Sequence, residues 1–260
     1  MTILEEIIAY KKIIVKDQKE KIPFRTLEQT EFFERPVISL SYSIKNAAKT
    51  SIIAEFKKKS PSKGDINENA KPEEVTKGYA DAGASGLSVL TDMKYFGGSN
   101  EDLIKAREVN EIPILRKDFT VDEYQVLEAK SVGADAILLI AACLTKQEAM
   151  NLARIAKSLQ LEVIMEVHEL KELNQVNNYI DIIGVNNRNL KTFEVDIKTS
   201  IDLIKHIPAE FLKISESGIS NPDTIKKLKD YGYDGFLIGE NFMKSKNPGE
   251  AFREFVERLK

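Results

Sequence analysis

The sequence predicts a (β/α)8 barrel on three observations: a strand-then-helix unit that recurs eight times, strands that are apolar throughout, and helices with clear start and stop signals. The candidate strands begin near Ser51, Gly86, Ile112, Ala136, Glu162, Ile182, Phe211 and Asp234. Successive starts lie 20 to 35 residues apart, which leaves room for the helix and loops of a parallel crossover. Eight such units predict a closed barrel, because an open eight-stranded sheet would leave two edges.

The chain before the first strand does not follow this repeat. Residues 3 to 15 carry apolar side chains at helical spacing, which predicts an amphipathic helix. Residues 39 to 49 are expected to form a second helix that leads into the first strand. We expect residues 1–48 to be a helical extension of one barrel domain that spans residues 1–260. Such an extension would cover the bottom of the barrel or lie across its mouth.

The strands and helices of the repeat are each marked by local signals. Residues 136–140 and 162–165 are almost wholly apolar, as is typical of strands covered on both faces. Helix starts are marked by Asn before Pro, or by Pro before two Glu, at Asn221-Pro222, Asn247-Pro248 and Lys71-Pro72-Glu73-Glu74. Helix ends are marked by glycines where a left-handed residue is needed, at Gly83, Gly133 and Gly232.

The composition excludes several classes of protein. The 38 Lys and Arg residues nearly balance the 41 Asp and Glu residues, so we expect no nucleic-acid or membrane partner. The longest apolar run, residues 136–144, has nine residues, against the ~20 that span a bilayer. The charges of Glu5 and Lys11 do not fit a signal peptide, and the single Cys143 excludes an intramolecular disulfide. We therefore expect a cytoplasmic protein that acts on a small molecule.

Polar residues gather where the strands are expected to end, and in such barrels chemistry sits at the carboxyl ends of the strands. The residues expected to face inward there are Glu55, Lys57, Lys117, Glu166, Asn186 and Glu216. Taken singly, Lys57 fits a solvated basic run, Lys117 a surface ion-pair cluster and Glu166 a salt-bridge partner. Buried charge is unfavourable unless it is paired, so their convergence favours a functional site. His168 and His206 are interpreted as structural or solvated, and Cys143 as a small buried hydrophobe.

The last two strands end in glycine-containing loops, Ser217-Gly218 and Gly239-Glu240. Glycine lets backbone N–H groups approach an anion, so these loops predict a phosphate site, although short turns are the simpler reading. Glu240 argues against an anion site unless only its backbone N–H faces inward.

Six blocks of the sequence follow one another in a recognisable order, at residues 53–62, 116–119, 166–168, 186–188, 215–219 and 238–240. Together they resemble the indole-3-glycerol-phosphate synthase family, and residues 91–99 resemble the second βα loop of that family. The resemblance covers essentially the whole chain. A match to any single block would be weak evidence for the family, but six blocks in the same order make the resemblance highly specific.

The resemblance implies a carboxy-lyase of tryptophan biosynthesis that converts 1-(2-carboxyphenylamino)-1-deoxyribulose 5-phosphate to indole-3-glycerol phosphate, CO2 and water. It implies that Lys117 delivers a proton to the carbonyl oxygen and that Glu166, or alternatively Glu55, does acid–base work. Lys57 would bind a substrate anion and donate a proton in dehydration, and Asn186 would hold sugar hydroxyls. The division of acid–base roles stays open. The implied substrate-binding residues are Ser60, Phe96, Phe119, Arg188, Glu216, Ser217, Gly218, Gly239 and Glu240, the last standing where many members have Ser.

We expect no metal or organic cofactor, because restored aromaticity drives the decarboxylation and the sequence lacks the common metal and nucleotide motifs. The main rival is phosphoribosylanthranilate isomerase, which is expected to have a Cys/Asp acid–base pair near the ends of strands 1 and 4. Here the first strand ends in Glu55 and Lys57, with no Cys. A catalytically silent barrel would have lost Glu55, Lys117 or Glu166, and all three are present. We expect a monomer, and association with other enzymes of the tryptophan pathway is left open.

Overall fold

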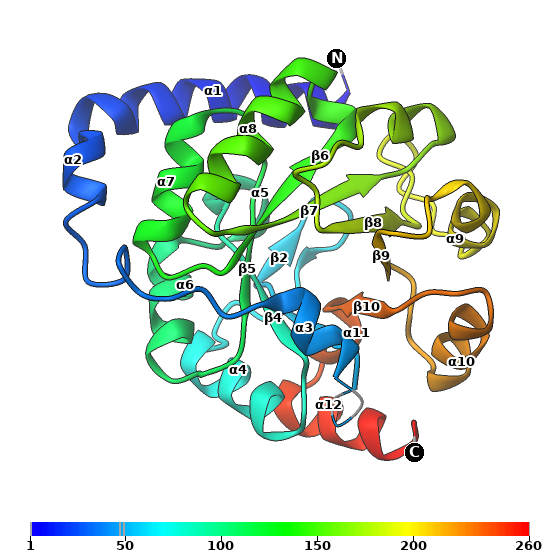
Figure 1. The fold of residues 1–260 in the computed structure, drawn as a ribbon. Helices are drawn as coiled ribbons and strands as arrows, with labels where there is room; N and C mark the ends of the chain where they lie inside the picture. Colours follow the sequence, from blue (N-terminus) through cyan, green and yellow to red (C-terminus); the bar gives the residue numbers. More distant parts are fainter. Residues whose placement is uncertain (1, 47, 49, 260) are drawn as a thin grey trace.

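In the computed structural model, which describes residues 2–46, 48 and 50–259, eight parallel strands close into a barrel (Figure 1). They are β1 (Ile52–Phe56), β4 (Gly86–Leu90), β5 (Ile114–Lys117), β6 (Ala136–Ile140), β7 (Glu162–Val167), β8 (Ile182–Asn186), β9 (Leu212–Glu216) and β10 (Gly235–Ile238). They follow one another in chain order, and β1 closes the barrel by pairing with both β4 and β10. The predicted (β/α)8 barrel is confirmed, and each strand starts within two residues of its predicted position.

Helices follow each strand along the chain, and the longer ones cover the outside of the barrel (Figure 1). They are α4 (Pro72–Asp81), α5 (Met93–Phe96), α6 (Asn100–Glu108), α7 (Glu123–Ser131), η1 (Ala141–Cys143), α8 (Lys146–Ser158), η2 (Leu170–Gln175), α9 (Lys198–Leu203), η3 (Ile204–His206), α10 (Pro222–Asp230), α11 (Glu240–Met243) and α12 (Pro248–Glu257). The side chains of Asn221 and Asn247 cap α10 and α12 as predicted. Gly83, Gly133 and Gly232 have φ values of 95°, 90° and 104° and end helices as predicted. None of the helices described here is both long and apolar enough to cross a bilayer.

One connection departs from the predicted repeat, because β7 and β8 are joined by the six-residue 3-10 helix η2 and not by an α-helix. Turn-forming asparagines follow it, and the side chain of Asn177 accepts a hydrogen bond from the backbone N–H of Tyr179. The Glu172 carboxylate turns back to the end of β7, where it accepts from the His168 N–H. These local bonds compete with the i→i−4 pattern of an α-helix.

Side chains along each barrel strand alternate between the inside of the barrel and the layer beneath the helices. In β1, Ile53 belongs to the inner apolar cluster, whereas Ile52 and Ala54 belong to the larger cluster that surrounds the barrel. The inner cluster consists of Leu40, Ile44, Ile53, Leu115, Ala136, Leu138, Ile140, Ile164, Ile182, Leu212, Ile214 and Leu237. The inside of the barrel is therefore filled below the mouth, and the space for a ligand lies above this cluster.

The N-terminal extension covers both ends of the barrel. Helix α1 (Ile3–Lys21) passes over the mouth, where Leu4 and Ile7 line a cavity, and α2 (Phe24–Leu27) follows it. Helix α1 continues beyond residue 15, where the predicted helix ended, because no helix-breaking residue occurs before Pro23. Helix α3 (Leu40–Lys45) closes the bottom, where Leu40 and Ile44 join the inner cluster. It is shorter than the predicted helix over 39–49, of which residues 47 and 49 lie outside the described residues.

A buried ion cluster ties the extension to the outside of the barrel. The fully buried Asp135 accepts from the Arg35 guanidinium (2.5 Å) and the Ile38 N–H (2.8 Å) on one carboxylate oxygen. Its other oxygen accepts from Arg107 (2.8 Å) and the N–H of Ile114 (2.8 Å). One carboxylate therefore holds together the extension, helix α6 and strand β5.

Replacing Asp135 by asparagine is expected to lower the free energy of unfolding by about 3–5 kcal/mol, because it leaves buried guanidinium charge without its carboxylate. Urea denaturation measures the effect. Asp81→Asn is the matched control, since the Lys77–Asp81 pair is about half exposed on α4 and its loss should cost about 1 kcal/mol or less. Equal losses in the two variants would contradict this role for Asp135.

Candidate active site

Five strands end in polar side chains that face the mouth of the barrel. Each of these side chains comes two residues after a residue that faces the inside of the barrel. The strand alternation therefore points each polar side chain inward as well. The pairs are Glu55 after Ile53, Lys117 after Leu115, Glu166 after Ile164, Asn186 after Gly184, and Glu216 after Ile214. At Gly184 a Cβ would collide with the Glu216 carboxylate, so glycine is needed there to make room for it.

Two adjoining cavities open at this end of the barrel. The mouth cavity has an apolar wall that includes Leu4, Phe96 and Phe119, with the two rings 6.1 Å apart between centroids. The loop cavity lies against the ends of β9 and β10. The two share Glu55, Lys57, Ser62, Arg188, Phe193, Ser217 and Leu237. All fourteen residues that the sequence predicts for the site line one or both of them.

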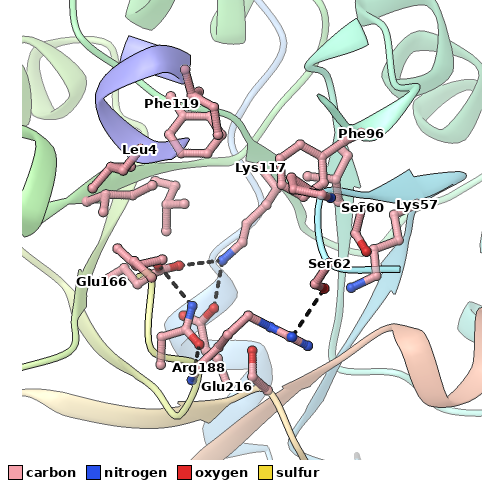
Figure 2. Close-up of a pocket in the computed structure, with 18 of the residues that line it drawn as sticks. Leu4, Lys57, Ser60, Ser62, Phe96, Lys117, Phe119, Glu166, Arg188 and Glu216 are labelled. Atoms are coloured by element: carbon pink, nitrogen blue, oxygen red, sulfur yellow. Dashed lines mark hydrogen bonds and ion pairs between the residues drawn. The ribbon is translucent and has the colours of Figure 1, made fainter. Parts of the chain in front are cut away.

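Lys117 lies at the centre of the mouth cavity (Figure 2). Its ammonium Nζ is 2.8 Å from Glu166 Oε2 and 2.6 Å from Glu216 Oε2. Burial disfavours the charge, but Glu166, Glu216 and Glu55 outweigh it and raise the pKa of Lys117 well above its ordinary value. Lys117 is therefore an ammonium at neutral pH.

The two carboxylates on Lys117 differ in their surroundings. Glu166 also accepts a hydrogen bond from Asn186 Nδ2 (3.1 Å), and His168 Nε2 lies 3.3 Å from the same oxygen, Oε1. Burial opposes ionisation of Glu166, but Lys117 and His168 outweigh it and lower its pKa. For Glu216, burial together with the charges of Glu166 and Glu55 raises the pKa despite Lys117. Neighbouring carboxyl groups with pKa values pushed apart are the pattern of acid–base sites.

Lys57 and Glu55 form a second pair where the two cavities meet. Lys57 Nζ is 2.9 Å from Glu55 Oε1, and the Ser88 hydroxyl donates to the other carboxylate oxygen at 3.2 Å. A Cβ at Gly239 would lie 2.7 Å from Glu55 Oε1, so glycine is required at the end of β10. Lys57 is thus within the buried site, although its neighbours form the basic run of the sequence.

The loop cavity is bordered by backbone that bends sharply. Ser217 and Gly218 both adopt left-handed conformations, with φ values of 67° and 73°, and a side chain at Gly218 would strike Val195. Arg188 reaches the cavity and lies 3.2 Å from the Ser62 hydroxyl (Figure 2). Its guanidinium also lies 3.4 Å from the Glu240 carboxylate. The Glu240 side chain therefore faces this region, so the condition under which Glu240 would not oppose an anion is not met, and Arg188 offsets its charge.

Ser60, in the short hairpin of β2 (Lys59–Ser60) and β3 (Gly64–Asp65), lines the mouth cavity. The structure also corrects two details of the sequence interpretation. The charges beside Lys117 are not a surface cluster, because Arg116 and Asp118 are both buried. Arg116 pairs with Glu128 behind the strand. Cys143 is half-buried.

Sequence reasoning missed two contributions to the site. Helix α1 supplies Leu4 and Ile7 to the mouth cavity, and no local pattern shows where that helix packs. His168, interpreted as structural or solvated, is buried beside Glu166. Its position two residues beyond Glu166, directly after the end of β7, was the signal for this contact. Among the described residues, no group of three or more His, Cys, Asp and Glu side chains is arranged to hold a metal ion.

A buried lysine held among carboxylates at the mouth of a (β/α)8 barrel, beside an apolar wall and a second cavity, is the arrangement of an enzyme active site of this fold. The family model described as indole-3-glycerol phosphate synthase matches residues 4–255. The chain belongs to the indole-3-glycerol phosphate synthase family, and it is a decarboxylating lyase of tryptophan biosynthesis.

Individual relatives agree with this assignment. The chain is 48% identical to indole-3-glycerol phosphate synthase from Bacteroides thetaiotaomicron, covering 99% of this chain and 98% of the relative. It is 40% identical to the Delftia acidovorans enzyme of the same name, covering 96% of this chain and 97% of the relative. The solved structure of 3-hexulose-6-phosphate synthase from Salmonella typhimurium superposes with a TM-score of 0.63 at 12% identity, covering 80% of this chain and 97% of that one. This last likeness shows the shared fold.

Proposed function

We propose that Lys117 and Glu166 carry the acid–base chemistry of indole ring closure on 1-(2-carboxyphenylamino)-1-deoxyribulose 5-phosphate. In this reaction an aromatic carbon attacks the ribulose carbonyl, CO2 leaves, and a hydroxyl departs as water. The observation that carries the proposal is the buried contact of Lys117 with Glu166 and Glu216, directly beneath the aromatic wall of the mouth cavity. Fluorescence detection of indole formation by the purified protein tests it.

Lys117 is the proton donor for ring closure. The carbonyl oxygen gains negative charge as the new carbon–carbon bond forms, and an ammonium at this point stabilises that charge and then supplies the proton. The raised pKa of Lys117 keeps the proton on Nζ until an alkoxide, a stronger base than an amine, appears beside it. Lys117 thereby becomes a neutral amine.

Glu166 is the base for dehydration, in which one proton must be removed and the departing hydroxyl must be protonated. The lowered pKa of Glu166 supplies an ionised carboxylate at neutral pH. Lys57 lies between the two cavities, where it can hold a substrate anion and protonate the leaving hydroxyl. Glu55 orients Lys57 through their 2.9 Å contact.

The two cavities match the two ends of the substrate. Phe96 and Phe119 would flank the aromatic ring in the mouth cavity. The phosphate would occupy the loop cavity, where Gly218 and Gly239 allow close approach of the backbone and Arg188 supplies positive charge. Asn186, which positions Glu166 here, would also reach the sugar hydroxyls between them.

Inorganic phosphate is expected to inhibit competitively at millimolar concentration, because it would occupy the loop cavity in place of the substrate phosphate. Initial rates at several substrate concentrations measure the effect, with chloride at matched ionic strength as the control. Arg188→Met should weaken the inhibition, whereas Arg253→Met, an exposed arginine on α12, should not. Failure of phosphate to compete at millimolar levels would contradict this location of the phosphate.

We also propose that the enzyme acts as a monomer in the cytoplasm on a phosphorylated small molecule. The fourteen proposed site residues all lie on one chain and line two adjoining cavities at one end of its barrel, which supports a monomer as the acting unit. The near balance of 38 basic and 41 acidic residues supports a small-molecule partner over nucleic acid or an anionic membrane.

A further inference from the structure

His168 contacts the proposed base but has no role in the steps above. It stands at the end of β7, and its side chain is 9% exposed. Its ring lies between two carboxylates, with Nε2 3.3 Å from Glu166 Oε1 and Nδ1 3.5 Å from Glu172 Oε2. The backbone N–H of His168 also donates to Glu172 Oε2 at 2.6 Å, which fixes the second carboxylate against the strand end.

We propose that protonated His168, oriented by Glu172, is a positioning residue that holds the Glu166 carboxylate in place and keeps it ionised through the catalytic cycle. This inference rests on the proposed role of Glu166 as the base. His168 acts on Oε1, the carboxylate oxygen that Lys117 does not contact. Oε2 of Glu166 thus contacts Lys117, whereas Oε1 lies within ion-pair distance of His168 and also accepts a hydrogen bond from Asn186 Nδ2.

The surroundings of His168 favour the imidazolium form. Burial opposes the charge, but Glu166 and Glu172 outweigh it and raise the pKa of His168 to about 9. The other titratable groups nearby are Lys117, beyond Glu166, and the thiol of Cys143, which burial and the same two carboxylates keep neutral by raising its pKa. Both ring nitrogens therefore carry a proton at neutral pH, and each faces an acceptor.

The second cation becomes essential when Lys117 has given up its proton. Lys117 then no longer lowers the pKa of Glu166, although Glu166 must remain ionised to act in dehydration. Within the described part of the chain, His168 lies outside the lining of both the mouth and loop cavities, so it keeps its proton while Lys117 reacts. Because His168 stays charged, Glu166 can act as the base in dehydration after Lys117 has given up its proton in ring closure.

His168→Gln, which keeps a neutral amide donor, is expected to lower kcat about 10- to 100-fold and to change KM less than threefold. The acid limb of the kcat profile should move to higher pH, because Glu166 loses one of the two cations that lower its pKa. The matched control is His206→Gln, which removes the only other histidine, exposed in η3, and should leave both kcat and the profile unchanged. A lower stability with an unchanged kcat and pH profile would reduce His168 to a packing residue and overturn the proposal.

NMR titration of the imidazoles tests the charge without relying on activity. The chain has two histidines, and His206→Gln assigns their signals. His168 should hold its proton to about pH 9, and its pKa should fall in both Glu166→Gln and Glu172→Gln. Stability linked to His168 should accordingly be present below about pH 6.5 and be lost as the pH rises through about 9.

Different results would contradict the role of His168 and the role of Glu166. A wild-type His168 that titrates near 6.5 and ignores Glu166→Gln would overturn the present inference and leave Glu166 as the base. A Glu166→Gln variant with the wild-type kcat would show that Glu166 is not the base. His168 would then have no catalytic role, even if its pKa still depended on Glu166.

Discussion

Replacing Lys117 by alanine is expected to reduce kcat by about 10³-fold or more, because general acid catalysis and stabilisation of the developing oxyanion are lost together. Lys117 is the cation shared by Glu166 and Glu216, so its removal also takes away the positive charge that lowers the pKa of both carboxyl groups. No neighbouring side chain replaces it at the same point, since Lys57 is held by Glu55.

The measurement is steady-state turnover at saturating substrate, with circular dichroism and thermal melting to confirm folding. The carboxyl groups left behind can take up protons and so avoid mutual repulsion, which should spare the fold. Lys117→Met fills the space of the side chain and provides a second folded variant, and Lys77→Ala on the exposed face of α4 is the control. Turnover at the wild-type kcat in either Lys117 variant would end its assignment as the general acid.

Replacing Glu166 by glutamine is expected to lower kcat about 10²- to 10⁴-fold while KM changes only a few-fold. The amide keeps the shape of the side chain but cannot accept a proton in dehydration. Glu101→Gln, at an exposed position of α6, is the matched control and should change neither constant. The two constants are obtained from initial rates over a range of substrate concentrations. An increase in KM with unchanged kcat would mean that Glu166 only binds the substrate.

The sequence predicted the barrel well because its signals are local. Apolar runs, caps such as Asn221 and terminal glycines such as Gly232 act within a few residues of the elements that they define. The prediction was wrong between β7 and β8, where Glu172 turns back to the strand and a 3-10 helix forms. That bond depends on side-chain placement and not on the spacing of apolar residues.

The site was predicted to the extent that it follows from the strands. Alternation turns Lys117 and Glu166 to the inside, and closure of the barrel brings their strand ends together. The contributions of Leu4 and of the His168 ring depend on packing between distant segments and on burial, which residue type alone does not show.

The most direct test is to add 1-(2-carboxyphenylamino)-1-deoxyribulose 5-phosphate to the purified protein and to follow the fluorescence of the indole product. The chain has no Trp, so its own indole background is absent. We expect the signal to grow with wild-type protein and to be lost in Lys117→Ala. A folded wild-type protein that produces no signal would contradict the account and would identify a catalytically silent barrel.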